Sequence, residues 1–489
     1  MAPSGKFYVT TPIYYVNDVP HAGHAYTTIA ADVLARHHRA RGDDTFFLTG
    51  TDEHGINVAN AAEQHGKSPK EYADEVVVHF KEAWRSLDIS NDYFVRTTDE
   101  RHEAAVQQFF LKWQQSGDIY KGTYEGLYCQ KCERYYQEDE LVDGKCPFHF
   151  TPPVRYSEEN YFFRLSQYRD RLVEAILDPN HPHHYEVEPL ARRNEVLGKL
   201  RQGLQDVSVS RPNLTWGVPL PFDRSHTIYV WMEALLNYVT AVGYGDDPAE
   251  FARRWPAQLH LMAKDIVWFH AIIWPAMLIS NGVPVPRRVY AHGFFTLNGR
   301  KMSKSLGNTL SPGQLVERYG ADGTRYLLLS EFPFGTDGDI SLRSFDNRFN
   351  SDLANDLGNL LNRTISMVNR YFGGQAPPLA GGADADAELR AAVEAMPGEV
   401  AGALERLEFA SALEGVRGVV SAGNRYVDAT QPWALARGDR ERLAVVIANL
   451  LETLRLVALE LRPFMPGSAD RMLSQLGIDA AAAGERRWG

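Results

Sequence analysis

The chain has 489 residues, which is enough for about three domains, because a single hydrophobic core stops growing at roughly 250–300 residues. Hydrophobic residues make up 44% of the sequence and charged residues 23%, which is the composition of a soluble globular protein. The net charge of −11 argues against a protein that coats nucleic acid with its whole surface, although it leaves room for a local basic face.

No segment of the sequence is typical of a membrane or secreted protein. The longest apolar stretch, residues 268–279, contains a histidine and a proline and is too short to span a bilayer. The start, MAPSGKFYVTT, has no basic segment followed by an apolar one, so it does not resemble a secretory signal. We therefore expect a cytoplasmic protein that makes no use of a membrane.

The first residues predict a strand, a helix and a second strand. Residues 7–10 are β-prone, and a helix with apolar residues at helical spacing begins near His21 and ends before Gly42. A second strand follows at residues 45–51. This order is typical of the opening unit of a doubly wound parallel sheet.

Two histidines, His21 and His24, stand at the start of that helix. The backbone N–H groups of a helix N-terminus attract phosphate, and imidazoles can donate hydrogen bonds to phosphate oxygens. Gly23 between them has no side chain, so a flat ring could lie against its backbone. Two histidines near a helix start are also common surface residues, and these two motif residues alone leave both interpretations open.

Asp52-Glu53-His54-Gly55 follows the second strand, at the end where open parallel sheets bind their ligands. A carboxylate at Asp52 can hold an ammonium group. The alternative is a helix N-cap followed by a turn, and the sequence does not separate the two interpretations.

All three cysteines of the chain lie in one pattern, C-x2-C-x13-C-x2-H. Its residues are Cys129, Cys132, Cys146 and His149. Three thiolates and one imidazole suit tetrahedral zinc, and four protein ligands leave no open position for water. The pattern therefore predicts a structural zinc site, within an insertion at residues 117–223; the alternative is unrelated thiols with a chance histidine.

The parallel-sheet pattern resumes after the insertion. Strands are predicted at residues 227–231, 259–263 and 289–296, with helices between them. The loop that follows, residues 298–308, carries three positive charges within five residues, between two glycines. Mobile cations of this kind suit a leaving polyphosphate, although a solvated basic loop is the alternative.

The last third of the chain is predicted to be helical. From Asn347, apolar residues recur at helical spacing, with Leu353, Leu357, Leu361, Ile365 and Val368 predicted on one face of the first helix. The pattern divides the chain into residues 1–116, 117–223, 224–297, 298–346 and 347–489. These are two halves of the sheet domain around the insertion, then the basic loop with its connection, and finally a helical bundle.

HAGH at a helix start and KMSKS in a late loop resemble the paired motifs of class I aminoacyl-tRNA synthetases. Within that class, TPIYYVN, FLTGTDEHG, GRKMSKSLGN and DLGNLLNR resemble the methionyl-tRNA synthetase family, in its order. The resemblance covers nearly the whole chain. It implies an α/β fold, in which a Rossmann-type doubly wound parallel sheet carries a zinc-knuckle insertion and is followed by a C-terminal all-α helical bundle.

The resemblance also implies an activity and the residues that perform it. The activity is ligation of L-methionine to tRNA(Met) through a methionyl-adenylate, with Mg-ATP as substrate, structural zinc as cofactor, and AMP and diphosphate as products. The implied catalytic residues are His21, His24, Lys301 and Lys304. The implied methionine-binding residues are Ile13, Tyr15, Asp52, Trp231, Leu235, Tyr238 and His270, and those facing the anticodon are Asn359, Arg363 and Trp433.

Two departures from the family pattern matter. The family usually has an aspartate where this chain has Glu233, which leaves no direct role assigned to that residue. The sequence stops soon after the bundle, without the extra tRNA-binding and dimerisation module of some members, so a monomer is expected. Two alternatives stay open, a class I synthetase for another apolar amino acid and a catalytically silent tRNA-binding protein.

Overall fold

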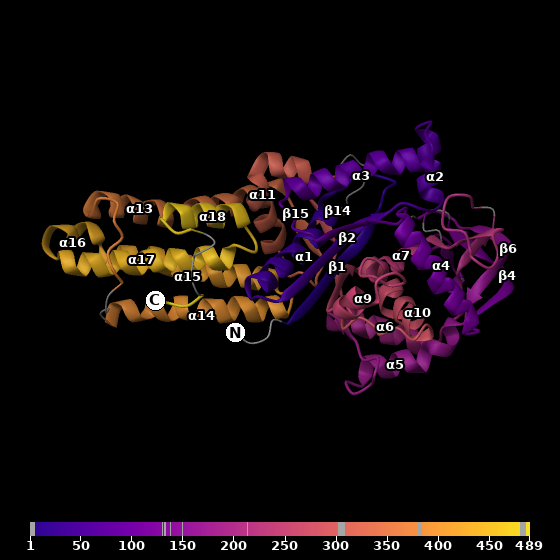
Figure 1. Ribbon diagram of the computed structural model, residues 1–489. Helices are drawn as coiled ribbons and strands as arrows, with labels where there is room; N and C mark the ends of the chain where they lie inside the picture. Colours follow the sequence, from indigo (N-terminus) through magenta and orange to yellow (C-terminus); the bar gives the residue numbers. More distant parts are fainter. Residues whose placement is uncertain are drawn as a thin grey trace. The chain divides into compact units, whose positions relative to one another are not determined.

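The computed structural model describes residues 5–129, 131, 134–136, 138–148, 150–212, 214–301, 309–379, 384–479 and 486–489. Over these residues the chain forms two compact units (Figure 1). The first unit comprises Met1–Pro20, His38–Glu82 and Ser90–His292, and the second comprises His21–His37, Ala83–Ile89 and Gly293–Gly489. No helix in the described part of the chain has both the length and the apolar character needed to cross a bilayer.

The first unit is built on a six-stranded sheet in which every neighbouring pair is parallel. Its order is β3 (Tyr93–Arg96), β2 (Asp44–Asp52), β1 (Lys6–Tyr15), β11 (Leu259–Ala263), β12 (Arg288–His292) and β7 (Glu186–Glu188). This confirms the α/β fold with a parallel sheet. The strand order reverses between β1 and β11, and a crevice at such a switch point is where open sheets bind ligands.

Helices and short antiparallel sheets complete the first unit. The helices are α2 (Ile56–Gln64), α3 (Pro69–Ser86), α4 (Glu100–Gln115), α5 (Arg169–Leu177), α6 (Leu190–Gln202), α7 (Val230–Leu235), α8 (Asn237–Thr240), α9 (Pro248–Arg254) and α10 (Trp274–Ser280), with a π-helical segment η4 (Phe269–Ile273). Helix α4 is amphipathic, and its Phe109, Phe110 and Trp113 are buried in the main core. That core also contains strand residues such as Tyr8 and Leu48.

The predicted strand at residues 227–231 is wrong as a member of the parallel sheet. Strand β10 covers only His226–Ile228 and pairs antiparallel with β9 (Ser210–Pro212), and helix α7 begins at Val230. The run of β-branched and aromatic residues reflects burial on all sides, since Ile228, Tyr229 and Val230 are all buried in the core. A short buried run is compatible with either a strand or a helix.

The range predicted as an insertion has its own antiparallel sheet. Its order is β5 (Arg134–Tyr136), β4 (Ile119–Cys129), β6 (Val154–Phe163) and β8 (Val207–Ser208). The same range also supplies β7, which pairs with β12 as the edge strand of the main sheet. A strand of three residues has too short a pattern to be recognised in the sequence.

The second unit combines a small sheet with a set of helices. The sheet has the order β14 (Arg300–Lys301), β13 (Phe295–Leu297) and β15 (Gly338–Ile340). The helices are α11 (Pro312–Ser330), α12 (Leu342–Arg348), α13 (Asn359–Phe372), α14 (Asp384–Glu405), α15 (Phe409–Thr430), α16 (Pro432–Gly438), α17 (Arg440–Leu461) and α18 (Pro466–Gln475). The C-terminal helical region is thereby confirmed. Helix α1 (Ala22–Ala40) contributes its first sixteen or so residues to this unit.

The buried face at the start of the bundle agrees with the predicted one in part, because Leu357 and Val368 are buried. Phe349–Gly358 is π-helical and precedes α13, and a π-helix has more residues per turn than an α-helix. Within α13, Leu360 and Thr364 are fully buried. Leu361 and Ile365, predicted on the apolar face, are only half-buried.

Candidate active site

The carboxyl ends of β1 and β2 bring three predicted methionine-binding residues together. Tyr15 pairs with Asp52 across the two strands, and Ile13 pairs with Gly50. Ile13 and Tyr15 are half-buried, whereas the exposed fraction of Asp52 is 2%. Gly55, the last residue of the Asp52 segment, is the N-cap position of α2, but no side chain of the segment, that of Asp52 included, caps the helix.

Aromatic rings form a wall beside these strand ends. The Trp231 ring lies edge-on to Tyr15, with centroids 6.1 Å apart, and stacks on Phe269 at 4.4 Å and 12°. Leu235, one helical turn after Trp231, is buried. Phe269 was missed as a site residue by the sequence interpretation. Its position next to His270 in an aromatic-rich helix was the only signal for it.

A buried tyrosine–histidine pair closes the arrangement. The Tyr238 hydroxyl lies 2.8 Å from His270 Nε2, and His270 Nδ1 lies 3.0 Å from the carbonyl oxygen of Ile266. A carbonyl can only accept, so Nδ1 carries the proton. Burial lowers the pKa of His270 to about 4, against a small opposing effect of the Ile266 hydrogen bond. The ring is therefore neutral near pH 7, and Tyr238 donates its hydroxyl proton to Nε2.

The seven predicted methionine-binding residues thus belong to one region of the first unit. Ile13, Tyr15 and Trp231 pack against the main core, which includes Leu235 and Tyr238. The Asp52 charge is close enough to contribute, after burial, to the raised pKa of Tyr238. The predicted methionine-binding residues therefore combine the buried carboxylate of Asp52 with neutral aromatic and aliphatic surfaces.

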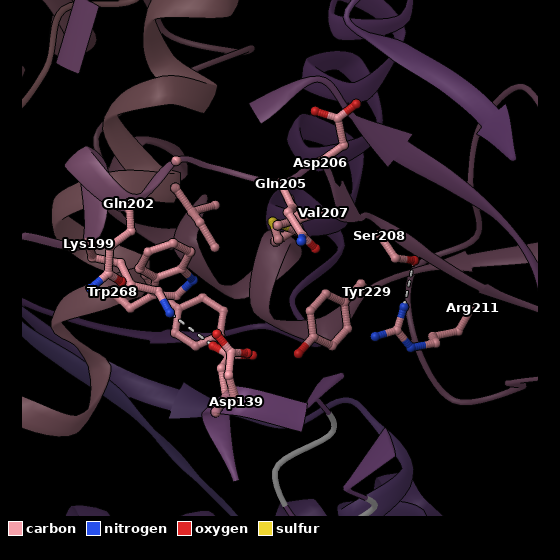
Figure 2. A pocket seen from close by; sticks show the side chains of 15 residues that line it. Asp139, Lys199, Gln202, Gln205, Asp206, Val207, Ser208, Arg211, Tyr229 and Trp268 are labelled. Carbon is pink, nitrogen blue, oxygen red and sulfur yellow. Dashed lines mark hydrogen bonds and ion pairs between the residues drawn. The ribbon is translucent and has the colours of Figure 1, made fainter. Parts of the chain in front are cut away.

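The first unit also has a cavity of about 250 Å³ (Figure 2). Phe269 and Met232 line it together with Tyr229 and Trp268. The two basic side chains that line the cavity already have partners. Lys199 Nζ lies 3.0 Å from a carboxylate oxygen of Glu140, and Arg211 donates hydrogen bonds to two serines. Arg211 Nη1 donates to Ser208 Oγ and to the Ser210 carbonyl, both at 2.8 Å.

In the second unit, the two histidines at the start of α1 form a stacked pair with ring centroids 3.9 Å apart. The Gly23 N–H donates to His21 Nδ1 at 3.0 Å, and the His21 N–H donates to His24 Nδ1 at 3.2 Å. Burial lowers the pKa of both imidazoles, and the neighbouring His21 lowers the pKa of His24 further. Both rings are therefore neutral with Nδ1 as acceptor, which leaves the proton on Nε2 as a donor for phosphate oxygens.

The close packing in this motif explains the glycine. A Cβ at position 23 would lie 2.8 Å from His21 Cε1 and 3.0 Å from its Nδ1. Any larger residue would therefore displace the His21 ring.

The basic loop starts from a tight β-hairpin. Asn298 and Gly299 have positive φ values of 53° and 71°, as a two-residue hairpin turn requires. They lead into β14, where the backbone of Lys301 pairs with Thr296. Lys304 and the rest of KMSKS lie outside the described residues.

Two of the predicted zinc ligands lie close together. Cys129, at the end of β4, and Cys146 share a small buried cluster with Tyr136, whose hydroxyl is 3.7 Å from Cys146 Sγ. Cys132 and His149 lie outside the described residues. Among the described residues there is no group of three or more histidine, cysteine or acidic side chains with the arrangement of a metal site.

The predicted anticodon residues lie on two helices of the second unit. Asn359 begins α13 and is exposed, and Arg363, one turn later, forms an ion pair with Asp428 at 2.9 Å. Trp433 stands near the start of α16 with 44% of its surface exposed. An exposed indole can stack on an unpaired base.

Known proteins share this fold and these motifs. A family profile described as "tRNA synthetases class I (M)" matches residues 7–152 and 149–365, and one for the "anticodon binding domain of methionyl tRNA ligase" matches residues 377–487. The methionine–tRNA ligase of Caldanaerobacter subterraneus is 49% identical over 96% of this chain and 74% of its own. That of Streptomyces coelicolor is 45% identical over 97% of this chain and 90% of its own.

Solved structures agree with these sequence matches. The methionyl-tRNA synthetase of Mycobacterium tuberculosis in complex with methionyl-adenylate matches with a TM-score of 0.94 and 41% identity, over 98% of this chain and 95% of that one. The ligand-free form of the Mycobacterium enzyme matches with a TM-score of 0.85 and 38% identity, over 98% of this chain and 94% of that one. Since the first profile alone covers more than half of the residues, the chain belongs to the methionyl-tRNA synthetase family of class I aminoacyl-tRNA synthetases.

Proposed function

We propose that this chain joins L-methionine to tRNA(Met) in two steps, through a methionyl-adenylate. The observation that carries the proposal is the region around Asp52, where the buried carboxylate of that residue stands beside neutral aromatic walls. It is supported by family membership and by the adenylate named with the similar Mycobacterium structure.

The region suits methionine chemically. The Asp52 carboxylate would hold the substrate ammonium, because a buried carboxylate gains strongly from a cation. Trp231, Tyr15 and Leu235 would enclose the thioether, which is polarisable and packs well against aromatic rings. Tyr238 and neutral His270 add no charge near the side chain. A charged or hydroxylated side chain would be disfavoured here.

In the first step, a methionine carboxylate oxygen attacks the α-phosphorus of Mg-ATP. A carboxyl–phosphate bond forms while the bond to the bridging oxygen breaks, and diphosphate leaves with the electron pair. The Nε2–H groups of His21 and His24 would donate to phosphate oxygens. Lys301 and Lys304 would neutralise the leaving diphosphate, where charge builds up most in the transition state.

In the second step, a ribose hydroxyl of the terminal adenosine of tRNA attacks the methionyl carbonyl, and AMP leaves. No covalent enzyme intermediate is needed, because the adenylate is already activated. Holding the ribose hydroxyl and the methionyl carbonyl in the right orientation is enough to accelerate the reaction. Asn359, Arg363 and Trp433 would contact the anticodon, and Trp433 would stack on a base.

We further propose that residues 117–223 form an insertion with a structural zinc held by Cys129, Cys132, Cys146 and His149. The burial of Cys129 and Cys146 in one cluster supports two thiolates facing a common point. The test is metal analysis: purified protein should contain about one zinc per chain, and Cys146→Ser should release it and lower Tm. Zinc-free protein with an unchanged Tm would contradict the site.

Exchange of labelled diphosphate into ATP tests the main proposal. Methionine should support this exchange, whereas leucine, isoleucine and valine should not. Exchange with one of those three amino acids instead of methionine would indicate another class I synthetase. No exchange with any amino acid would favour a silent tRNA-binding protein. We also propose a cytoplasmic monomer, and light scattering coupled to gel filtration would test its mass.

A further inference from the structure

Glu233 lies in a buried cluster with two imidazoles, on the side of α7 away from Trp231. The exposed fractions of Glu233, His54 and His102 are 0%, 3% and 2%. His54 Nδ1 lies 3.1 Å from each Glu233 carboxylate oxygen, and His102 Nε2 lies 3.2 Å from Oε1. An ionised carboxylate only accepts, so both imidazoles donate these hydrogen bonds. His102 Nδ1 in turn bonds the Thr240 hydroxyl at 2.8 Å.

The cluster joins the end of β2, which carries Asp52, to α7, which carries Trp231 and Leu235. His54 follows Asp52 by two positions, directly after β2. Glu233 lies on α7 between Trp231 and Leu235. Residues four apart share a face of a helix, while one midway between them points to the opposite face. Trp231 and Leu235 therefore lie on the proposed methionine side of α7, while Glu233 points the other way and contacts His54, two residues after Asp52.

Helix α7 depends on such contacts for its position. It has only six residues, and no side chain caps its N-terminus. A helix this short is not stable by itself and takes its place from tertiary packing. Next to His54, the Trp216 indole donates to the carbonyl of Glu53 at 2.6 Å, which fixes the β2 side of the connection.

We propose that Glu233 and His54 are positioning residues, which set the distance between the ammonium-binding carboxylate of Asp52 and the aromatic wall that begins at Trp231. This inference rests on the proposed assignment of Asp52 and Trp231 to the methionine site. It also gives a role to Glu233, where the family usually has the shorter aspartate.

The charge state of the cluster makes the role measurable. Burial lowers the pKa of His54, but Glu233, with Glu103 and Glu53, raises it above its ordinary value. Burial raises the pKa of Glu233, but His54 and His102 lower it below its ordinary value. Glu103 faces His54 Nε2 from α4 at 3.7 Å, and Arg96 pairs with Glu53 at 2.7 Å.

The connection is consequently strongest when His54 is protonated. As pH rises through the raised pKa of His54, the imidazolium is lost and a buried carboxylate remains without its cation. Methionine binding should therefore weaken as pH rises through the pKa of His54.

The test is methionine affinity, measured by calorimetry between pH 6 and 8.5, below the titration of the substrate ammonium. Glu233→Gln keeps the size and removes the charge. We expect its methionine Kd to rise about tenfold at pH 6, with the KM for ATP within twofold of the wild type. The midpoint of its pH dependence should move to lower pH, because the carboxylate that raises the pKa of His54 is gone. Glu233→Asp restores the charge and should restore the midpoint.

Two further variants make the outcome specific. Glu100→Gln removes an exposed carboxylate from the same helix as His102, and should behave as the wild type. Asp52→Asn should weaken methionine binding at every pH. If it does not, the assignment of the methionine site is wrong. If Asp52→Asn weakens binding while Glu233→Gln leaves both Kd and midpoint unchanged, the positioning role alone is wrong. A wild-type affinity that is constant from pH 6 to 8.5 would also overturn the inference, whether or not the variants fold.

Discussion

Replacing His270 with glutamine should remove a specific acid sensitivity of the folded chain. Burial lowers the pKa of this imidazole from 6.5 to about 4. Between these values the unfolded chain binds a proton at His270 that the folded chain does not, so lowering the pH favours unfolding. Each tenfold change in proton affinity corresponds to about 1.4 kcal/mol, so His270 should cost about 3 kcal/mol of stability as pH falls from 7 to 4. Glutamine can donate to the Ile266 carbonyl and accept from Tyr238, but it does not titrate.

The measurement is the free energy of unfolding from urea titrations at pH 7, 5.5 and 4.5. The variant should lose about 2–3 kcal/mol less than the wild type between pH 7 and 4.5, whatever its stability at pH 7. His260, which is also buried with a lowered pKa, stays in both proteins and contributes to both curves. Parallel curves would refute the reasoning, because they would mean that His270 is protonated in the folded state or exposed to water.

The other predictions concern activity. Gly23→Ala should lower adenylate formation by about 10²-fold at nearly unchanged Tm, since the new methyl group displaces only the His21 ring; unchanged exchange kinetics would contradict the role of that ring. Lys304→Ala should lower kcat for adenylate formation about 10²–10³-fold with little change in the KM for methionine, and a raised KM at full kcat would assign it to ground-state binding. Arg363→Ala and Trp433→Ala should impair aminoacylation but leave diphosphate exchange intact. Loss of exchange and Tm together in Trp433→Ala would mean that the indole is structural, despite its 44% exposure.

The sequence predicted the parts of the fold that have long, regular patterns. Strands β1, β2 and β11 and helix α1 each carry enough apolar residues at a fixed period to be recognised. The motif residues were recognised because their chemistry and order are unusual. Tyr15 and Asp52 end β1 and β2, and their common location at one edge of the sheet follows from the topology of parallel strands.

The sequence did not predict features that depend on tertiary packing. The segment from His226 to Val230 is apolar because it is buried, and that pattern does not tell an antiparallel strand from the start of a helix. No residue type marks the π-helical segment before α13, and the burial of Leu360 and Thr364 just after it was not predicted. His54, His102 and Glu233 lie more than forty residues apart in the chain, so their cluster appears only when three elements meet.

Two histidines near the same sheet edge show how neighbours decide charge. His270 contacts a carbonyl and a hydroxyl, and neither group carries a negative charge that would stabilise an imidazolium. Burial therefore lowers the pKa of His270 to about 4 and keeps the ring neutral. His54 is equally buried but meets the Glu233 carboxylate, and its pKa is raised. The neutral ring belongs to the proposed substrate side of α7, and the ring with the raised pKa belongs to the opposite side. The proposed site can thus bind a thioether without placing a desolvated charge next to it. The Glu233–His54 pair, which we propose positions Trp231, lies on the opposite side of α7 from the thioether.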